Sequence, residues 1–164
     1  MILLSFATEI KGDSTVDAHT DWITVDSLQW GVGRAISASG QGKDRDPSNP
    51  SFSEVTLTKS MDVASVDLFS QATCGKSLGT GKIHFIQTGG SDAKSQVYLE
   101  IELAECIVSS YSQSSGGDRP QESVSINFNQ LVMKYSTFKD GKTVVAGAFK
   151  GYDLKTNAYT TAIK

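Results

Sequence analysis

The chain has 164 residues, of which 38% are hydrophobic and 20% charged, and its formal net charge is −3. A chain of this length can bury roughly 70% of its unfolded surface and needs no disulfide or metal to fold. The negative charge and the lack of a basic stripe argue against nucleic acid as a partner. We therefore expect one domain over residues 1–164, with no bound cofactor.

The first twelve residues, MILLSFATEIKG, predict a strand at their start, because apolar residues recur at the alternate positions Ile2, Leu4 and Phe6. This segment has no positively charged start, and its apolar core is too short for a secretory signal. No stretch of the chain approaches the roughly 20 apolar residues of a membrane span. We expect a protein that is cytoplasmic at first, is not inserted into membranes, and leaves the cell, if it does, without a signal peptide.

Alternating apolar residues predict further strands along the rest of the chain. The long segment from Ser37 to Ser51, SASGQGKDRDPSNPS, is polar and is predicted as an extended loop, a length that is usually functional or disordered. The predicted strands are 23–25, 28–32, 52–59, 82–88, 97–103, 121–135 and 143–150.

One helix is predicted, from Asp62 to Cys74. Ala64, Leu68 and Ala72 recur every four residues, with Val66 and Phe69 beside them. Asp62 or Ser65 suits the start of the helix, and Gly75 suits a left-handed stop. The pattern as a whole favours an all-β domain with one helix, arranged as a barrel or a tight sandwich.

The parity of the apolar residues changes at three places: between Val25 and Leu28, near Ala104–Cys106, and between Phe128 and Leu131. A change of parity within a strand indicates a bulge, or a strand that exchanges one buried face for the other. Strands that curl around a barrel corner do this, and so do strands whose outer face is covered by a neighbouring subunit.

No catalytic motif stands in the right context. Gly75-Lys76-Ser77-Leu78-Gly79 matches the G-x-S-x-G elbow, but the predicted helix precedes the serine where a strand is required. Asp44 to Asn49 lacks the glycine of a calcium loop. Glu100 and Glu102 share one strand face and are interpreted as its solvated side. We expect no enzyme activity and no metal.

The cysteines and histidines suggest structural roles. Cys74 and Cys106 are interpreted as two reduced thiols, although a disulfide is possible if the fold brings them together. His19 and His84 have no metal-like spacing, and His84 is interpreted as an ordinary strand side chain.

A polar segment, Gly116 to Glu122, directly precedes the best predicted strand. Gly117, Asp118, Arg119 and Glu122 have two interpretations, an active-site cluster or a structural corner closed by local polar contacts. We favour the corner, in which the glycines permit a turn and Pro120 presets the entry to the strand.

An ordered set of motifs resembles the haemolysin-coregulated protein family, Hcp, of the bacterial type VI secretion system. The motifs cover nearly the whole chain and none is decisive alone. They are IKGDST (10–15), HTDWITV (19–25), LQWG (28–31), FSEVTLTKSMD (52–62), VSSY (108–111), GGDRPQESV (116–124), INF (126–128) and GYDLK (151–155).

This resemblance implies a mainly β fold, a small β-barrel of two packed sheets with one flanking helix and a long extended loop. It further implies that copies of the chain form six-membered rings that stack into a tube and are secreted by the apparatus itself. The implied partners are the chain itself, the spike, the contractile sheath, the baseplate and small effector proteins in the lumen.

Several residues acquire candidate roles on this basis. The ring-stacking loop contains Gln41, Lys43, Asp44, Arg45 and Asp46, and its charges and prolines differ from the glycine-rich loops expected in many members of the family. Gln29 is a candidate for the lumen, because it lies beside Trp30 on the opposite strand face. The candidates for the contact between subunits are Leu131, Met133 and Tyr135.

Two other functions remain open at this stage. A tube protein of a contractile phage tail would have the same architecture. A monomeric enzyme or ligand-binding barrel would instead need a pocket with convergent polar groups.

Overall fold

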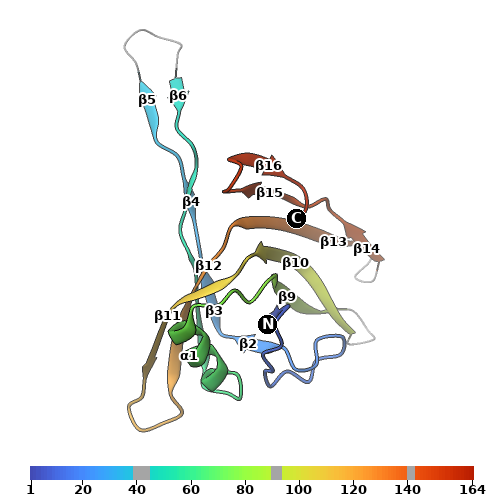
Figure 1. Ribbon diagram of the computed structural model, residues 1–164. Coiled ribbons are helices and arrows are strands. Elements are labelled where there is room, and N and C mark those ends of the chain that lie inside the picture. Colours follow the sequence, from blue (N-terminus) through green and yellow to red (C-terminus); the bar gives the residue numbers. More distant parts are fainter. Residues whose placement is uncertain (39–44, 90–93, 140–142) are drawn as a thin grey trace.

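Two antiparallel sheets form the body of the molecule in the computed structural model, which describes residues 1–38, 45–89, 94–139 and 143–164 (Figure 1). The order of strands in the larger sheet is β16 (Ala158–Thr160), β15 (Lys150–Asp153), β13 (Gln130–Lys139), β10 (Lys94–Ala104), β9 (Gly81–Gly89), β1 (Ile2–Phe6) and β2 (Ile23–Val25), and β14 (Thr143–Ala146) pairs with β13. The order in the smaller sheet is β11 (Ile107–Ser114), β12 (Gln121–Asn127), β8 (Val55–Ser60) and β3 (Ser27–Gln29).

The predicted mainly β fold with two packed sheets and one helix is confirmed. In the part of the chain that the structure describes, the outer strands β16 and β2 of the larger sheet do not pair with each other, so no closed barrel is formed. The core lies between the two sheets and under the helix. Its buried side chains are Leu4, Phe6, Ile10, Ile23, Val25, Val55, Leu57, Ala64, Leu68, Leu78, Ile83, Ile101, Leu103, Cys106, Val108, Val124, Ile126, Phe128 and Leu131.

The three parity changes mark the three places where a strand leads directly into a strand of the other sheet, whereas the crossing from β8 to β9 runs through α1. β2 ends at Val25 in the larger sheet, and β3 begins at Ser27 in the smaller one. β10 likewise leads into β11 through Glu105, whose φ is +54°. A strand that changes sheets must reverse which of its faces points to the core, so each change of parity reports a corner.

The third corner corrects one prediction. The single strand expected over 121–135 is two strands, β12 and β13, that belong to different sheets and are separated by Phe128 and Asn129. The backbone N–H of Asn129 donates to the carbonyl of Ala104 at 2.9 Å, which joins this corner to the neighbouring one.

The helix α1 runs from Ser65 to Cys74 and begins three residues later than predicted. Asp62 still organises the start, since its carboxylate accepts the backbone N–H of Ala64 at 2.9 Å. Gly75 ends the helix with φ +62° and donates its N–H to the Gln71 carbonyl, as the sequence predicts. Ala64 and Leu68 face the core, but Val66 and Phe69 are exposed.

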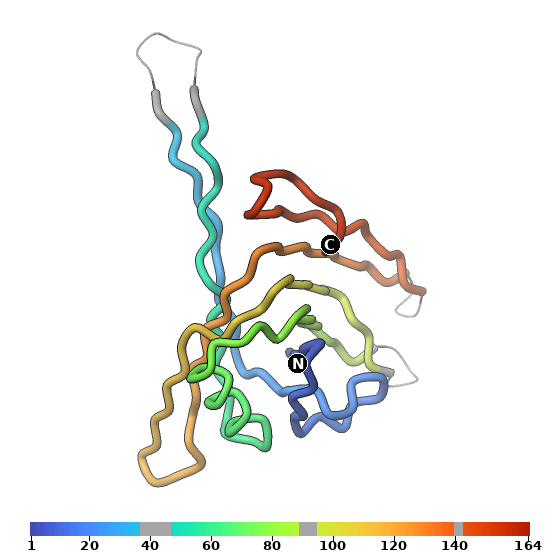
Figure 2. Tube along the Cα trace, in the orientation of Figure 1, coloured from blue at the N-terminus to red at the C-terminus, as the bar shows by residue number. Residues whose placement is uncertain are grey.

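The described residues of the segment predicted as a loop, 37–38 and 45–51, belong to a two-stranded ribbon that projects from the body. β4 (Val32–Gly33) pairs with β7 (Ser51–Phe52), and farther out β5 (Ile36–Ala38) pairs with β6 (Arg45–Pro47). We call residues 31–38 and 45–53 the arm, and Figure 2 shows how it leaves the two-sheet body as a narrow double strand. These strands could not be predicted from apolar alternation, because neither face of the ribbon is buried in a core.

Candidate assembly surfaces

The arm is held straight by hydrogen bonds between its two strands. Ser48 Oγ accepts the backbone N–H of Ala35 at 3.0 Å, and Ser53 Oγ accepts that of Gly31 at 2.8 Å. Val32 and Ile36 are exposed on it. A two-stranded ribbon is marginally stable by itself and presents unpaired edges, so this arm has the features of a segment that binds a partner.

Two of the five predicted ring-stacking residues belong to the described part of this arm. Arg45 and Asp46 lie in β6, where Asp46 is in register with Ser37 and Arg45 with Ala38. Gln41, Lys43 and Asp44 lie outside the described residues.

The lumen candidate Gln29 ends β3 at the edge of the smaller sheet, and its side chain is exposed. Trp30 is half-buried against the core, with its ring parallel to that of Phe52 at 6.4 Å between centroids. The two neighbours therefore differ in burial as their alternation predicts, while a role of Gln29 in a lumen stays a prediction.

The three candidates for a contact between subunits differ in exposure. Leu131 is 3% exposed and packs in the core of its own chain, whereas Met133 is 40% and Tyr135 60% exposed. The parity argument placed these residues on one face, but the burial of that face changes along β13, which is buried at Gln130–Val132 and more exposed from Met133 to Tyr135. The available surface is therefore reduced to Met133 and Tyr135.

The corner before β12 is a hairpin turn between β11 and β12. Gly117 has φ +117°, which favours glycine, and Ser115 Oγ bonds to the Asp118 carbonyl and the Gly117 N–H. Within the described residues, no hydrogen bond or ion pair of the Asp118 or Arg119 side chain is found. The turn is thus tied by serine and glycine, and not by the two charged residues.

Glu122 does not belong to that corner, because it points into the protein from β12. Its Oε2 lies 3.0 Å from Nζ of Lys59, a fully buried lysine on β8. Lys59 also donates to Asp62 Oδ1 at 2.7 Å and to Ser65 Oγ at 3.2 Å. Tyr111 completes the cluster by donating its hydroxyl to Glu122 Oε1 at 2.7 Å.

Each charged group of this Lys59 cluster has an oppositely charged partner within the cluster. Burial would raise the pKa of the Glu122 carboxyl, but hydrogen bonds from Ser65, Tyr111 and Lys59 and the Lys59 charge together lower it. Burial and the adjacent carboxylate raise the pKa of Tyr111 to about 12. One feature of the sequence indicates that Lys59 is buried. Val55, Leu57 and Lys59 stand at alternate positions of β8, on the face that points to the core.

A second unpredicted pair joins His19 and His84, whose Nε2 and Nδ1 atoms lie 2.8 Å apart. His19 Nδ1 is 3.3 Å from the Asp17 carbonyl, which favours a tautomer in which His84 donates to His19. Trp22 lies against both rings at 4.7 Å. Burial is the main cause that lowers the pKa of His84 to about 4.

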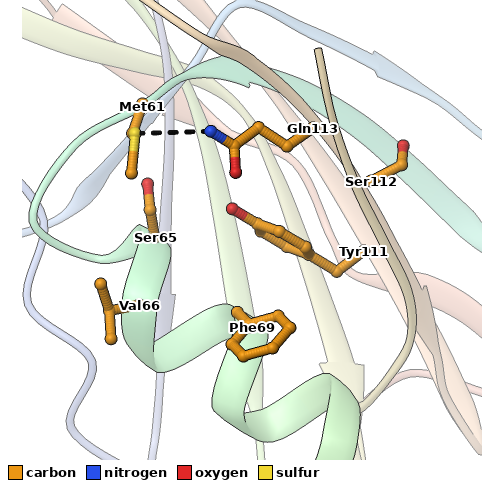
Figure 3. A pocket seen from close by; sticks show the side chains of 7 residues that line it. All are labelled: Met61, Ser65, Val66, Phe69, Tyr111, Ser112 and Gln113. Carbon is orange, nitrogen blue, oxygen red and sulfur yellow. Dashed lines mark hydrogen bonds between the residues drawn. The ribbon is translucent and has the colours of Figure 1, made fainter.

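An apolar groove opens between α1 and β11, with a volume of about 310 Å³. Figure 3 shows Phe69 of the helix beside Tyr111, with their rings 5.8 Å apart, and Val66 as a further lining residue on the helix. Met61 and Gln113 close one end through a contact of 3.8 Å between Nε2 and Sδ. The groove is mostly apolar and carries no cluster of groups suited to catalysis.

The two cysteines differ in exposure, since Cys74 is exposed and Cys106 is buried. Cys74 and Cys106 are both free, and burial raises the pKa of the Cys106 thiol to about 12, which makes it unreactive. No group of three or more potential metal ligands is found in the ranges that the structure describes. Among the same residues, no helix is long and apolar enough to cross a membrane.

Comparison with known proteins identifies the family that this chain resembles. A family model described as "Type VI secretion system effector, Hcp" matches residues 4–135. Protein hcp1 of Pseudomonas aeruginosa is 28% identical over 153 residues, which cover 91% of this chain and 92% of that protein.

Solved structures give the same result. One described as a type six secretion system protein has a TM-score of 0.87 at 28% identity, and the match covers 97% of this chain and 98% of the other. Hcp1 from Salmonella typhimurium has a TM-score of 0.73 at 23% identity, with 97% of each chain covered.

Proposed function

This chain belongs to the Hcp family of type VI secretion system proteins, and on that premise we propose that it is a structural subunit of the secretion tube. In this proposal six copies close into a ring, and the rings stack into a tube that is expelled with the puncturing device. The arm is the observation that carries the proposal, because it exposes Val32 and Ile36 to solvent.

Stacking is the role that we assign to the arm. A ribbon that projects from a compact body can reach a surface beyond the reach of the body, and the exposed apolar side chains gain stability when that surface covers them. Residues Gln41 to Asp46 would then meet the next ring. The charged residues among them suit a polar and reversible contact.

Ring closure requires two different surfaces on each subunit, because a cyclic hexamer uses head-to-tail contacts. The exposed apolar residues of this chain support that requirement, since they occur in separate groups on β13, β14 and α1. Gln29 is proposed to face the lumen, in which small effector proteins are carried.

Secretion follows from assembly in this proposal. The subunit is made in the cytoplasm, assembles with the spike, sheath and baseplate, and leaves through the apparatus without a signal peptide. We propose a structural role without enzyme activity, supported by the family.

Light scattering coupled to gel filtration tests ring and stack separately. The intact chain is expected to have about six times the 17.5 kDa mass of one chain. A variant in which residues 35–48 are replaced by a short glycine-serine link should keep the ring and lose the higher assemblies that form at high concentration. A monomer at every concentration would contradict the proposal.

A further inference from the structure

The chain between β1 and β2 contains a compact loop, residues 13–22, which we call the cover segment. Figure 2 shows it as part of the blue loop to the lower right of the N-terminus. Its base is fixed by backbone hydrogen bonds, in which Ser14 donates to Trp22 at 3.1 Å and Asp21 donates to Ser14 at 2.8 Å. Ala18 and Asp21 have φ values of +64° and +63°, which non-glycine residues rarely adopt. The strained loop therefore depends on contacts with the rest of the chain.

These contacts lie on the face of the larger sheet that points away from the core. Ile83 of β9 belongs to the core between the sheets, so its neighbour His84 points to the opposite face. Leu3 of β1 is in register with His84 and lies on that same face, where it is nonetheless fully buried. His19 and Trp22 both contact the His84 ring there. The cover segment thus shields this part of the outer face.

His19 is the side chain that joins the cover segment to the sheet. It is 6% exposed, and its Nε2 atom lies 2.8 Å from Nδ1 of His84. Its other ring nitrogen, Nδ1, lies 3.3 Å from the Asp17 carbonyl. Trp22 packs against both imidazole rings, with 4.7 Å between centroids. The join therefore contains a hydrogen bond between two rings that can both take up a proton.

The hydrogen bond between the two rings tolerates one added proton but not two. In the neutral pair, one of the two facing nitrogens donates and the other accepts. One added proton still leaves an acceptor between the rings. A second proton places N–H groups on both facing nitrogens, which are 2.8 Å apart, and puts two positive charges into a partly buried site. The doubly protonated pair cannot keep this geometry.

The surroundings of His84 do not favour additional positive charge. Glu100 of β10 is in register with His84, but its carboxylate lies 2.7 Å from the Lys134 ammonium of β13 and is already paired. Burial, His19, Lys82 and Lys134 together outweigh Glu100 and lower the pKa of His84 to about 4. The strands β1 and β2 carry no ionisable side chain. The other charged groups in this part of the chain are Lys11, Asp13, Asp17, Asp21 and the amino group of Met1.

We propose that the cover segment is released by acid: when His19 and His84 are both protonated, residues 13–22 detach from the outer face of β9 while the two-sheet body stays folded. Detachment relaxes the left-handed backbone at Ala18 and exposes the face on which Leu3 lies. The device acts within one chain and does not depend on the proposed ring.

Hydrogen exchange of the full chain, read by mass spectrometry at pH 7 and pH 4.5, tests this release. The ratio of intrinsic to observed exchange rate at each pH, the protection factor, removes the direct effect of pH on exchange. Protection over residues 13–22 should fall about tenfold or more, while protection of β8 and β12 stays within about twofold. Unchanged protection over residues 13–22 overturns the proposal. An equal fall in β8 and β12 also overturns it, because the opening would then be global.

Two variants remove the second proton from opposite sides of the pair. Glutamine can still form a hydrogen bond but does not titrate, so His84→Gln and His19→Gln should each reduce the fall over residues 13–22 to less than about threefold. Either variant suffices if the other does not fold. A fall as large as in the unmodified chain overturns the role of the pair.

The matched control is Lys82→Gln, two residues from His84 on the same strand. The Lys82 side chain is 50% exposed, and its replacement leaves both histidines in place. This variant should keep a fall of about tenfold or more over residues 13–22 between pH 7 and pH 4.5. Loss of the fall in Lys82→Gln would show that the histidine pair does not control the segment.

Discussion

Side chains are buried with partners in the region around β8, whereas several are exposed to solvent in the projecting arm. β8 buries even a lysine, Lys59, and surrounds it with carboxylates and hydroxyls from its own chain. The arm leaves Val32 and Ile36 open to solvent. The region around β8 satisfies its buried polar groups within its own chain, whereas the arm leaves apolar side chains exposed. Substitutions in the first region should therefore change folding, and those in the second should change assembly.

The largest effect is expected at the Lys59 cluster. Lys59→Met leaves Glu122 and Asp62 buried without a counter-charge, which should cost about 3–5 kcal/mol in the free energy of unfolding measured with urea. The double variant with Glu122→Gln removes one of those carboxylates and should recover part of the loss. A loss below about 1 kcal/mol for Lys59→Met would show that the cluster does not stabilise the fold.

A smaller loss is expected at Tyr111, which donates to Glu122 and also forms a wall of the groove. Tyr111→Phe removes one hydrogen bond to a carboxylate and should cost about 1.5–3 kcal/mol in urea unfolding. Phenylalanine keeps the aromatic side chain that lines the groove, so the oligomer seen in light scattering should be unchanged under conditions in which the protein is folded. Loss of the oligomer without loss of stability would contradict a role of Tyr111 in folding and would assign it to assembly instead.

The His19–His84 pair should make stability depend on pH. The pKa of His84 is lowered to about 4 in the folded protein, so folding favours the neutral form. Its contribution is complete above the ordinary pKa of 6.5 and is lost as the pH falls from there through about 4. The effect should be smaller than those above, because the imidazole is partly solvated.

Thermal unfolding between pH 7 and pH 4 measures this contribution. His84→Gln carries no titrating group at position 84, so its melting temperature should fall less over this range than that of the unmodified chain. Parallel curves for the two proteins would contradict the assignment.

The smallest effect on folding is expected in the arm. Ile36→Ser changes an exposed side chain that contributes little to the core, and the free energy of unfolding should stay within about 0.5 kcal/mol. Stacked assemblies should nevertheless diminish in sedimentation at high protein concentration. If stacking is unchanged, the outer arm does not hold the rings together.

The sequence predicted most of the body because alternation reports burial directly. Its parity changes located all three corners between the sheets, and Gly75 located the end of α1. The strand order was not accessible, since the alternation of β12 says nothing about whether β8 or β13 lies beside it. The strands of the arm were missed because a ribbon without a buried face has no hydrophobic period.

The assembly surfaces were predictable only in part. Leu131, Met133 and Tyr135 share a parity, but burial changes along β13 from one residue of that face to the next, and parity does not report this change. The partnership of Lys59 with Glu122 joins residues on neighbouring strands, so it needed the register of β8 and β12. The His19–His84 contact likewise depends on how the chain before β2 folds back over the larger sheet.

Negative-stain electron microscopy of the purified chain tests the central claim most directly. If the chain is a tube subunit, the images should show uniform rings with six-fold symmetry and a central opening, and short stacks at high concentration. Isolated particles of single-chain size at the same high concentration would contradict it.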